Sequence, residues 1–317
     1  MVRRIGILTS GGDSPGMNAA IRAVTRVGLN SGLEVFGIYN GYKGMVEGYI
    51  EPLTRETVGE IVNRGGTVLG SARLPEFKDI EVRKKAIHQL KKRGIEAVVV
   101  IGGDGTIIHA AKKAAVYNRP VLGINAGRIG YLASIEPSDI EKLPEIIAGD
   151  YTVDERIMLN VLHKKRGGAK EYTAFNDVVL SKGALSRMTD IKLSVDEHIL
   201  RYRADGLIVA TPTGSTAYSL SAGGPVVEPS VGNILVTPIC PYEFIKKPII
   251  LPSEARLSVA ADTDGDREFF LTVDGEIAVK IEKTDRVYIK KSNKTVKLIK
   301  YRAESFLDRL ERKLQQN

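Results

Sequence analysis

The sequence has a single cysteine and no long hydrophobic run, and each of these absences excludes a class of protein. With only Cys240 the chain can form no internal disulfide, which fits a reducing compartment. The apolar runs are short, as at residues 97–101, and none approaches the roughly 18 residues of a membrane-spanning helix. Too few apolar residues precede Ser10 to form the core of a secretory signal. We therefore expect a cytoplasmic protein without a membrane partner.

The composition is that of an ordinary soluble globular protein. The 317 residues are 43% hydrophobic and 26% charged, which excludes collagen-like and disordered chains, and their number suggests about two domains. The net charge of +8 comes from scattered Lys and Arg residues that no nucleic-acid-binding motif accompanies. We therefore expect no nucleic-acid partner, and interpret the positive charge as a solvated surface or as affinity for phosphorylated small molecules.

The first half alternates strand-like and helix-like segments. This alternation predicts a Rossmann-like α/β domain over residues 1–150, with a parallel sheet covered by helices on both faces. The expected strands lie at 5–9, 34–39, 97–101 and 121–124, and the expected helices at 15–29, 55–63, 80–93, after 106 and at 138–147.

The pattern changes near residue 150 to strands separated by turns, with one helix at 215–222. It predicts a mainly antiparallel β domain over 151–302, followed by a C-terminal helix over 303–317 that could return to the first domain. The expected strands lie at 159–162, 172–180, 191–195, 199–202, 207–210, 234–237, 248–251, 257–260, 269–273, 277–281 and 287–289. We find no repeats and no flexible linker at the boundary.

Two glycine-rich turns follow strands and precede helices in the first half. The first, Ser10-Gly-Gly-Asp-Ser-Pro-Gly-Met-Asn18, fits a plain turn as well as a loop whose backbone N–H groups bind phosphate at a helix N-terminus. The second, Gly102-Gly-Asp-Gly-Thr106, adds a carboxylate that could hold Mg²⁺ or accept a proton from a hydroxyl group. Because ligands of open α/β sheets bind where the parallel strands end, the pair predicts one crevice.

Two polar segments of the second half are further candidates for a binding site. Residues 203–224 are dense in glycine and hydroxyl residues, but helix caps and close packing explain such a density better than a ligand does. Asn176 and Asp177 interrupt an apolar strand pattern, and polar groups there must be paired or used.

The first third resembles bacterial ATP-dependent 6-phosphofructokinase, from residue 1 to about 106. The resemblance lies in residues 5–22, 63–67, 70–77, 90–95 and 99–105. It implies ATP contacts, which we expect from Gly12, Tyr42, Arg73, Gly103, Gly105 and Thr106. The sugar-phosphate residues of that family are missing, because residues 124–130 read Ile-Asn-Ala-Gly-Arg-Ile-Gly, so phosphorylation of fructose-6-phosphate should be lost. Three residues match its effector pocket and are interpreted as surface charge: Arg22, Arg26 and Arg55.

From Gly102 to about residue 301 the chain instead resembles NAD kinase. The motifs that carry this resemblance are at residues 102–106, 123–125, 127–130, 176–177, 204–206, 211–218, 221–225 and 237–241. The two resemblances meet at residues 102–105, which predicts a chimera-like chain, either an engineered join or a natural fusion. An unbroken genomic reading frame for the whole chain would exclude an engineered join.

The NAD kinase resemblance assigns roles to individual residues. It implies that Asp104 is the general base that deprotonates the adenosine-ribose 2′-hydroxyl of NAD, and that Gly105 lets the backbone approach the dinucleotide. The positions expected to bind NAD are Asp104, Gly105, His109, Asn176, Asp177, Arg187, Arg203, Asp205, Thr216, Ala217, Tyr218, Ser221 and Glu276. Three positions depart from the family: His109 stands where Arg is frequent, Tyr242 where many members have His, and Glu276 where Gln is common.

The expected function is that of an NAD kinase, which transfers a phosphoryl group from ATP to NAD and gives NADP. With one cysteine and four scattered histidines we expect no metal site made by protein alone. Mg²⁺, or another divalent cation, would bind mainly through substrate phosphates, with Asp104 as a contact through Mg-ATP. The resemblance also implies a homodimer or homotetramer. The alternative is an engineered phosphofructokinase/NAD kinase chimera that folds and binds nucleotide but has weak or no kinase activity.

Overall fold

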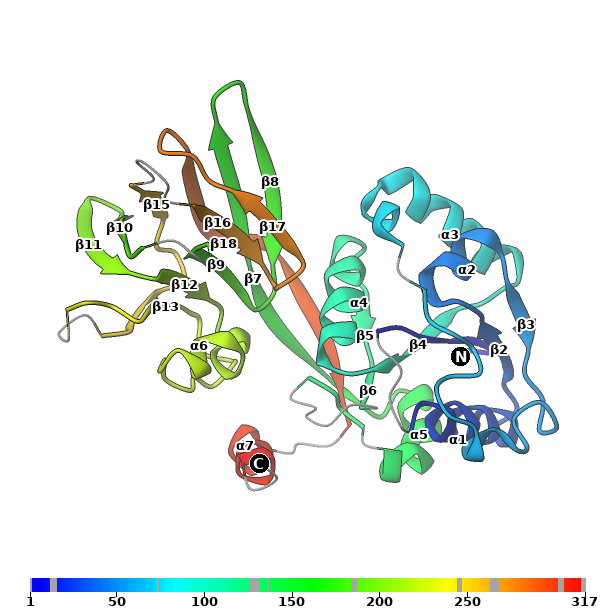
Figure 1. Ribbon diagram of the computed structural model, residues 1–317. Coiled ribbons are helices and arrows are strands. Elements are labelled where there is room, and N and C mark those ends of the chain that lie inside the picture. Colours follow the sequence, from blue (N-terminus) through cyan, green and yellow to red (C-terminus); the bar gives the residue numbers. More distant parts are fainter. Residues whose placement is uncertain are drawn as a thin grey trace. The chain divides into compact units, whose positions relative to one another are not determined.

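The chain divides into two compact units in the computed structural model (Figure 1). The structure describes residues 2–11, 16–72, 74–125, 132–135, 137–183, 187–243, 247–262, 268–301 and 305–314. The first unit comprises Met1–Asp154 together with Lys297–Asn317, and the second comprises Glu155–Val296. None of the helices in the described part of the chain is long and apolar enough to cross a membrane.

The first unit contains a five-stranded sheet in the order β3-β2-β1-β4-β6. Its strands are β1 (Arg4–Thr9), β2 (Glu34–Ile38), β3 (Ile50–Pro52), β4 (Ala97–Gly102) and β6 (Gly123–Asn125). The pairs β1–β2, β1–β4 and β4–β6 are parallel, whereas β3 is antiparallel to β2. This arrangement confirms the predicted Rossmann-like parallel sheet.

Helices cover both faces of this sheet because the central strands are apolar on both sides. Ile5 and Ile7 pack with α1 (Met17–Asn30) and α5 (Leu143–Ala148), while Leu8 packs on the opposite face. That opposite face is covered by α2 (Gly41–Glu47), α3 (Ile80–Lys92) and α4 (Asp104–Val116). Figure 1 shows α1 and α5 on one side of the strands and α2 and α3 on the other. The remaining elements of this unit are η1 (Ile61–Asn63), η2 (Pro75–Lys78), η3 (Pro137–Lys142), β5 (Pro120–Val121) and α7 (Phe306–Leu314).

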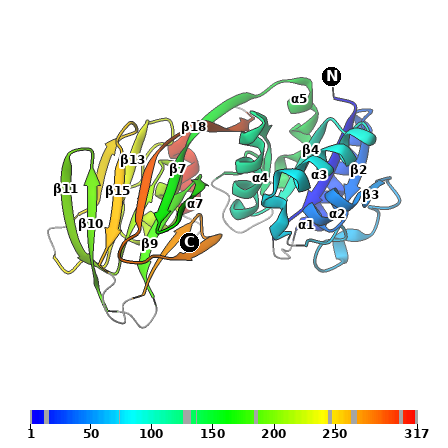
Figure 2. The same ribbon diagram turned by 90° about the horizontal axis from the view of Figure 1, so that it is seen from above.

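The second unit is built from two β-sheets. One has the order β11-β10-β15-β18-β7-β8, with β5 also paired to β18, and the other has the order β14-β13-β12-β9-β16-β17. The first sheet contains β7 (Thr152–Lys165), β8 (Gly168–Ala174), β10 (Thr189–Val195), β11 (His198–Ala204), β15 (Leu257–Ala261) and β18 (Arg286–Lys300). The second contains β9 (Asp177–Lys182), β12 (Gly206–Ala210), β13 (Asn233–Ile239), β14 (Ile249–Pro252), β16 (Phe269–Val273) and β17 (Ile277–Lys280). Figure 2 shows β11, β10 and β15 in order along one layer.

One hydrophobic core fills the space between these two sheets. Leu207 and Val209 of β12 point into this core together with Leu193 of β10. The alternate residues Ile208 and Ala210 are buried on the other face of β12, against a separate cluster that includes Val227. β12 is therefore apolar along its whole length, as expected for a strand with both faces covered.

The structure corrects one predicted helix outright. Residues 55–63 form a single turn, two bends and the short η1 instead of a helix. The hydroxyl groups of Thr54 and Thr57 each accept a hydrogen bond from the other residue's backbone N–H, at 3.3 and 2.9 Å, and Gly59 follows. Such local side-chain bonds compete with helix formation, and glycine is a poor helix former, so the turn does not propagate.

Other predicted elements exist with different boundaries. The strand expected at 172–180 breaks at Phe175 and Asn176, because β8 and β9 belong to different sheets. The strand expected at 121–124 likewise divides into β5 and β6. The helix expected at 215–222 is reduced to η4 (Thr213–Thr216) and α6 (Tyr218–Ser221), since the backbone of Ala217 is not helical. The fourth helix, α4, begins at Asp104 and not after Thr106.

A buried hydrogen bond between His163 and Asp285 yields a test of the stability of the second unit. His163 and Asp285 are 2% and 3% exposed, and their side chains are joined at 2.8 Å. The substitution Asp285→Ala leaves the imidazole without this partner in the interior, so we expect it to lower the free energy of unfolding by about 1–3 kcal/mol. Denaturant unfolding followed by circular dichroism measures this loss.

The matched control for this test is Asp262→Ala. Asp262 forms an exposed ion pair with Lys283 at 3.6 Å, and such pairs contribute less than about 1 kcal/mol. Equal losses of stability in the two variants would contradict a special role for the buried pair.

Candidate functional site

Thr106 joins the two glycine turns of the first unit. Its Oγ1 donates a hydrogen bond to the carbonyl oxygen of Ser10 at 2.8 Å. A Cβ atom on Gly102 would lie 2.6 Å from this Oγ1, and a Cβ atom on Gly11, whose φ is +97°, would lie 2.9 Å from it. Glycine at 11 and 102 is therefore required by the packing of this chain. The predicted proximity of the two turns is confirmed at Ser10 and Thr106, whereas Gly12 lies outside the described residues.

Asp104 is the first residue of α4 and follows the N-cap Gly103. The side chain is half-buried, and its Oδ1 accepts a hydrogen bond from the backbone N–H of Leu132 at 3.2 Å. A negative charge is favourable at this end of a helix, because the first N–H groups and the helix dipole point toward it. The fold therefore holds one carboxylate in a fixed orientation at the end of β4.

Gly105 differs from Gly102 in what surrounds it. A Cβ atom built on Gly105 would meet no atom of the described residues within 4 Å, outside its own turn of helix and chain neighbours, and its φ is not positive. Gly105 is also exposed. The packing of the described residues therefore gives no reason for glycine at this position.

The other expected residues of the first unit gather around a lysine. Tyr42 is 7% exposed, and its ring packs against Phe77 and His109, with centroids 4.8 and 5.6 Å apart. Lys113 Nζ lies 3.7 Å from the centroid of the Tyr42 ring, a cation–π contact. Tyr42 and His109 therefore pack against each other, and these ring contacts do not test their expected roles in binding nucleotide. Arg73 lies outside the described residues.

In the second unit, the corner between β8 and β9 is bonded to the turn that follows β12. Thr211 Oγ1 donates to the carbonyl oxygen of Phe175 at 2.7 Å, and Thr211 N donates to that of Asn176 at 2.9 Å. Gly214 lies so close that a Cβ atom on it would be 2.2 Å from the Asn176 carbonyl oxygen. The predicted residues Asn176 and Asp177 therefore lie against the start of the hydroxyl-rich segment.

The other side of this corner is held by Asp274. Its carboxylate accepts hydrogen bonds from the backbone N–H groups of Phe175, Asn176 and Asp177 at 2.8 to 3.1 Å. The side-chain oxygen of Asn176 is buried and has no hydrogen-bond partner among the described residues. A buried amide oxygen without a partner is costly in a stable fold, and a ligand that donates a hydrogen bond would remove this cost.

The hydroxyl-rich segment divides into inward and outward residues. Ser215 Oγ exchanges hydrogen bonds with the backbone of Val227, and Ser219 Oγ is 2.8 Å from Thr237 Oγ1; all three hydroxyl groups are buried. These residues support the interpretation as caps and close packing. The residues of this segment that are expected to bind NAD are all at least partly exposed: Thr216, Ala217, Tyr218 and Ser221.

The remaining expected residues lie elsewhere in the second unit. Asp205 pairs with Lys182 at 3.1 Å at the start of β12, whereas Asp177 is opposite Ala210 at the end of β12. At about 3.3 Å per residue, these two ends are roughly 17 Å apart. Arg187 and Arg203 are exposed, and Glu276 is exposed in the turn that contains Asp274. The fold therefore places Asn176 and Asp177 with the Thr211–Ser221 segment, and separates them from Asp205.

Sequence reasoning missed three residues that shape this site. Thr211 was expected only as a member of the motif at residues 211–218. Asp274 was given no role, although an Asp-Gly pair between two strands is a hairpin-turn signal. Arg156, 5% exposed, donates to Thr213 Oγ1 at 3.2 Å, and a charged residue inside strand β7 was its only signal.

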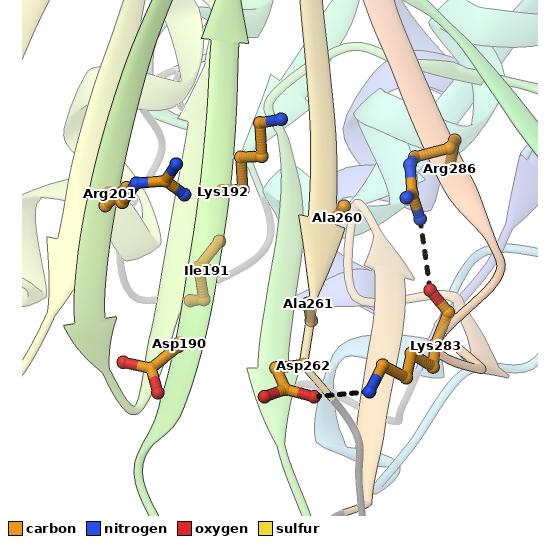
Figure 3. A pocket seen from close by; sticks show the side chains of 9 residues that line it. All are labelled: Asp190, Ile191, Lys192, Arg201, Ala260, Ala261, Asp262, Lys283 and Arg286. Carbon is orange, nitrogen blue, oxygen red and sulfur yellow. Dashed lines mark hydrogen bonds and ion pairs between the residues drawn. The ribbon is translucent and has the colours of Figure 1, made fainter.

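A shallow pocket of about 380 Å³ lies on the outer face of the first sheet of the second unit (Figure 3). It is lined by Asp190, Ile191, Lys192, Arg201, Ala260, Ala261, Asp262, Lys283 and Arg286. None of the residues expected to bind nucleotide lines it. Among the described residues no group of three or more His, Cys, Asp or Glu side chains could hold a metal ion.

Comparison with solved structures identifies the class of protein. An NADH kinase from yeast, solved in complex with NADH, has a TM-score of 0.72 and 25% identity, covering 98% of this chain and 86% of that one. An NAD kinase from Archaeoglobus fulgidus, solved in complex with ATP, has a TM-score of 0.67 and 22% identity over 99% of both chains. The fold is that of the NAD kinases.

Sequence comparison then gives the family. An NAD kinase from Magnetococcus marinus is 35% identical over 280 residues, which cover 86% of this chain and 92% of that protein. An NAD kinase from Moorella thermoacetica is 36% identical over 279 residues, with coverages of 86% and 89%. The chain belongs to the NAD kinase family.

Family models bear on the expected join. The Phosphofructokinase model matches residues 4–127, and the ATP-NAD kinase C-terminal domain matches residues 175–301. The Magnetococcus marinus relative leaves 14% of the 317 residues, about 44, outside its match, so that match includes more than half of residues 1–101. The two resemblances therefore overlap well beyond residues 102–105, and the expected boundary there is not confirmed.

The two glycines of the second turn should respond differently to alanine. Gly102→Ala places a methyl group 2.8 Å from the Ser10 carbonyl oxygen, and we expect a loss of about 1–3 kcal/mol of stability. Gly105→Ala meets open space in the first turn of α4, and we expect unchanged stability or a gain of up to about 1 kcal/mol. Thermal unfolding of both variants measures the difference, and an equal loss in both would contradict this difference in packing between the two glycines.

Proposed function

We propose that the chain transfers the terminal phosphoryl group of ATP to the adenosine-ribose 2′-hydroxyl of NAD and so produces NADP. The observation that carries this proposal is the corner at Asn176, where the backbone is fully hydrogen-bonded and a buried side-chain oxygen has no described partner. NAD kinase relatives at 35% and 36% identity over most of the chain support the same conclusion.

In this proposal the acceptor is activated by Asp104. Phosphoryl transfer depends mainly on positioning and on neutralisation of charge, and a carboxylate base takes the proton of the attacking hydroxyl. The hydrogen bond from Leu132 N–H to Oδ1 orients the carboxylate that we assign to the hydroxyl proton. Glycine at position 105 leaves room for the dinucleotide beside this base.

NAD is held in the proposal by residues of the second unit. Asn176 and Asp177 bind polar groups of the dinucleotide, and the Asn176 side-chain oxygen accepts one of its hydrogen bonds. Thr216, Ala217, Tyr218 and Ser221 line the adenine and ribose, as their accessible side suggests. His109 and Glu276 remain expected contacts that no contact in the structure tests.

ATP binds in the proposal at the two glycine turns of the first unit. The N-terminus of α4 directs its first N–H groups toward an anion, with Gly103 as the N-cap. The hydroxyl proton of Thr106 is used to join the turns, so Thr106 contributes to ATP binding chiefly by holding them together. Gly12, Tyr42 and Arg73 remain expected ATP contacts.

Mg²⁺ is proposed to accompany ATP. Mg²⁺ commonly keeps several waters and binds through substrate phosphates plus one or two carboxylates. The described residues fit that mode through one carboxylate, Asp104, which lies at the second glycine turn. When bound, the ion neutralises charge on the phosphates during transfer.

Asp104→Asn tests the catalytic role directly. The amide keeps an oxygen for the Leu132 N–H but cannot take a proton, so we expect kcat for NADP formation to fall by about 10²–10⁴-fold. NAD affinity measured by calorimetry should change little. The matched control is Asp79→Asn at the N-cap of α3, where the carboxylate accepts a hydrogen bond from Glu81 N at 2.8 Å. Retained activity in Asp104→Asn would refute its role as the base.

The phosphofructokinase match over residues 4–127 favours a second candidate, a chimera that binds nucleotide but has weak or no kinase activity. NAD, ATP and Mg²⁺ in one assay and fructose-6-phosphate, ATP and Mg²⁺ in another distinguish the candidates. NADP in the first assay supports the kinase. A folded protein that binds NAD but gives no product in either assay supports the chimera, and the genomic reading frame tells an engineered join from a natural fusion.

We further propose that the chain forms a homodimer or homotetramer. The expected NAD contacts form two groups at opposite ends of β12, Asp177 at one and Asp205 at the other, and a neighbouring subunit that supplied the second group would complete one pocket. Light scattering coupled to size-exclusion chromatography should give two or four times 34.5 kDa. A mass of 34.5 kDa at micromolar concentration would contradict this assembly.

A further inference from the structure

We propose that Asp274 is a positioning residue of the NAD site, which aims Asn176 and Asp177 at the dinucleotide without touching it. This inference rests on the proposed function, because it concerns how those two residues are held. The Asp274 side chain is half-buried in the turn between β16 and β17, and its carboxylate is directed at the corner between β8 and β9.

The corner needs an outside partner because the chain changes sheets there. β8 pairs with β7 in one sheet and β9 pairs with β12 and β16 in the other, so Phe175 and Asn176 belong to neither ladder. Their N–H groups would be left without partners, and buried backbone groups are almost always paired. Asp274 Oδ1 accepts from Phe175, Asn176 and Asp177 at 3.1, 2.8 and 3.1 Å, and Oδ2 accepts from Phe175 at 2.9 Å.

Every other backbone group of the corner is also paired. The N–H of Asp274 donates to the Asp177 carbonyl oxygen at 3.0 Å, and Thr211 donates to the carbonyl oxygens of Phe175 and Asn176. The corner therefore offers a ligand no backbone group. What it presents is the Asn176 side chain, whose direction follows from the backbone that Asp274 fixes.

The turn itself does not require an aspartate. Asp274 and Gly275 have φ of +47° and +67°, and Glu276 N donates to the Val273 carbonyl oxygen at 3.0 Å, the pattern of a type I′ turn. Asparagine and glycine suit the first of these two positions as well as aspartate does. The carboxylate is thus selected by the corner, where a charged acceptor binds N–H donors more strongly than a neutral one.

Two substitutions that preserve the turn separate these roles. Asp274→Gly removes the acceptor. Asp274→Asn replaces one carboxylate oxygen by an NH₂ group and keeps a single, uncharged oxygen as the acceptor for the three N–H groups. We expect the KM for NAD to rise about tenfold in Asp274→Gly and about threefold in Asp274→Asn, because three N–H groups lose part or all of their partner. The KM for ATP and kcat should stay within about twofold, since neither Asp104 nor the glycine turns change.

The matched control is Asp196→Asn. Asp196 also has a positive φ, +50°, in a hairpin turn of the same unit, but its carboxylate accepts a single N–H, from Arg256 at 3.2 Å. Its KM for NAD should equal that of the unmodified chain. A merely structural loss in the Asp274 variants would lower the active fraction, and so kcat, with both KM values unchanged.

Rescue by a free carboxylate gives a second readout. Acetate added to Asp274→Gly can occupy the vacated N–H groups, so the KM for NAD should fall back toward the unmodified value with rising acetate, and chloride at equal ionic strength should not have this effect. If Asp274→Gly does not fold, the threefold change in Asp274→Asn and calorimetric NAD affinity decide the matter. Unchanged KM and NAD affinity in Asp274→Asn, or in a folded Asp274→Gly, would overturn the inference.

The outcomes also distinguish this inference from the proposed function. An unmodified chain that makes NADP, with Asp274 variants that keep its KM for NAD, overturns the positioning role alone. An unmodified chain that neither binds nor phosphorylates NAD overturns the proposed function and, with it, the role of Asp274.

Discussion

The requirement that every buried backbone N–H and C=O group find a partner shapes the candidate site residues of each unit. In regular strands these groups pair with the neighbouring strand. Where the chain leaves a strand to form a site, side chains supply the hydrogen bonds that the neighbouring strand no longer provides. Thr106 binds the Ser10 carbonyl in the first unit, while Asp274 and Thr211 bind the corner at Phe175–Asn176 in the second. Small residues let these partners approach: Gly102 beside Thr106 and Gly214 beside Asn176.

Much of the fold could be predicted because its strongest signals are local. The apolar runs at β1 and β4 predicted strands of the parallel sheet, and the run at β12 predicted a strand of the β domain. Asp104 was noticed in a glycine turn after a strand, and Asn176 as a polar residue inside an apolar strand pattern. What could not be predicted depends on partners far away in the sequence. The break of the strand expected at 172–180 follows from a change of sheet, and the carboxylate that stabilises it is 98 residues away at Asp274. The wrong helix at 55–63 shows the opposite case, in which the local hydroxyl bonds of Thr54 and Thr57 outweigh a helical pattern.

The overlap of two family resemblances has a structural counterpart in the first unit. The segment that the Phosphofructokinase model matches, residues 4–127, contains a parallel sheet with glycine turns at the ends of β1 and β4. NAD kinase relatives match much of the same segment. A turn of this kind supplies N–H groups for phosphate and leaves the choice of acceptor to other residues. The polar corner of the second unit, which lies within the matched ATP-NAD kinase C-terminal domain, is where that choice is made in the proposed function.

The division of the first unit between the two ends of the chain has a consequence for biosynthesis. Domains tend to fold as they emerge from the ribosome, the earliest residues first. Here β5 can pair with β18 only after Leu298, the partner of Val121, has been synthesised. The whole of the second unit, Glu155–Val296, is translated between β5 and Leu298. The second unit, continuous from Glu155 to Val296, can complete its own core while the first unit, although made earlier, still lacks its last strand. A chain truncated after residue 296 and released would therefore carry a complete later unit and an incomplete earlier one.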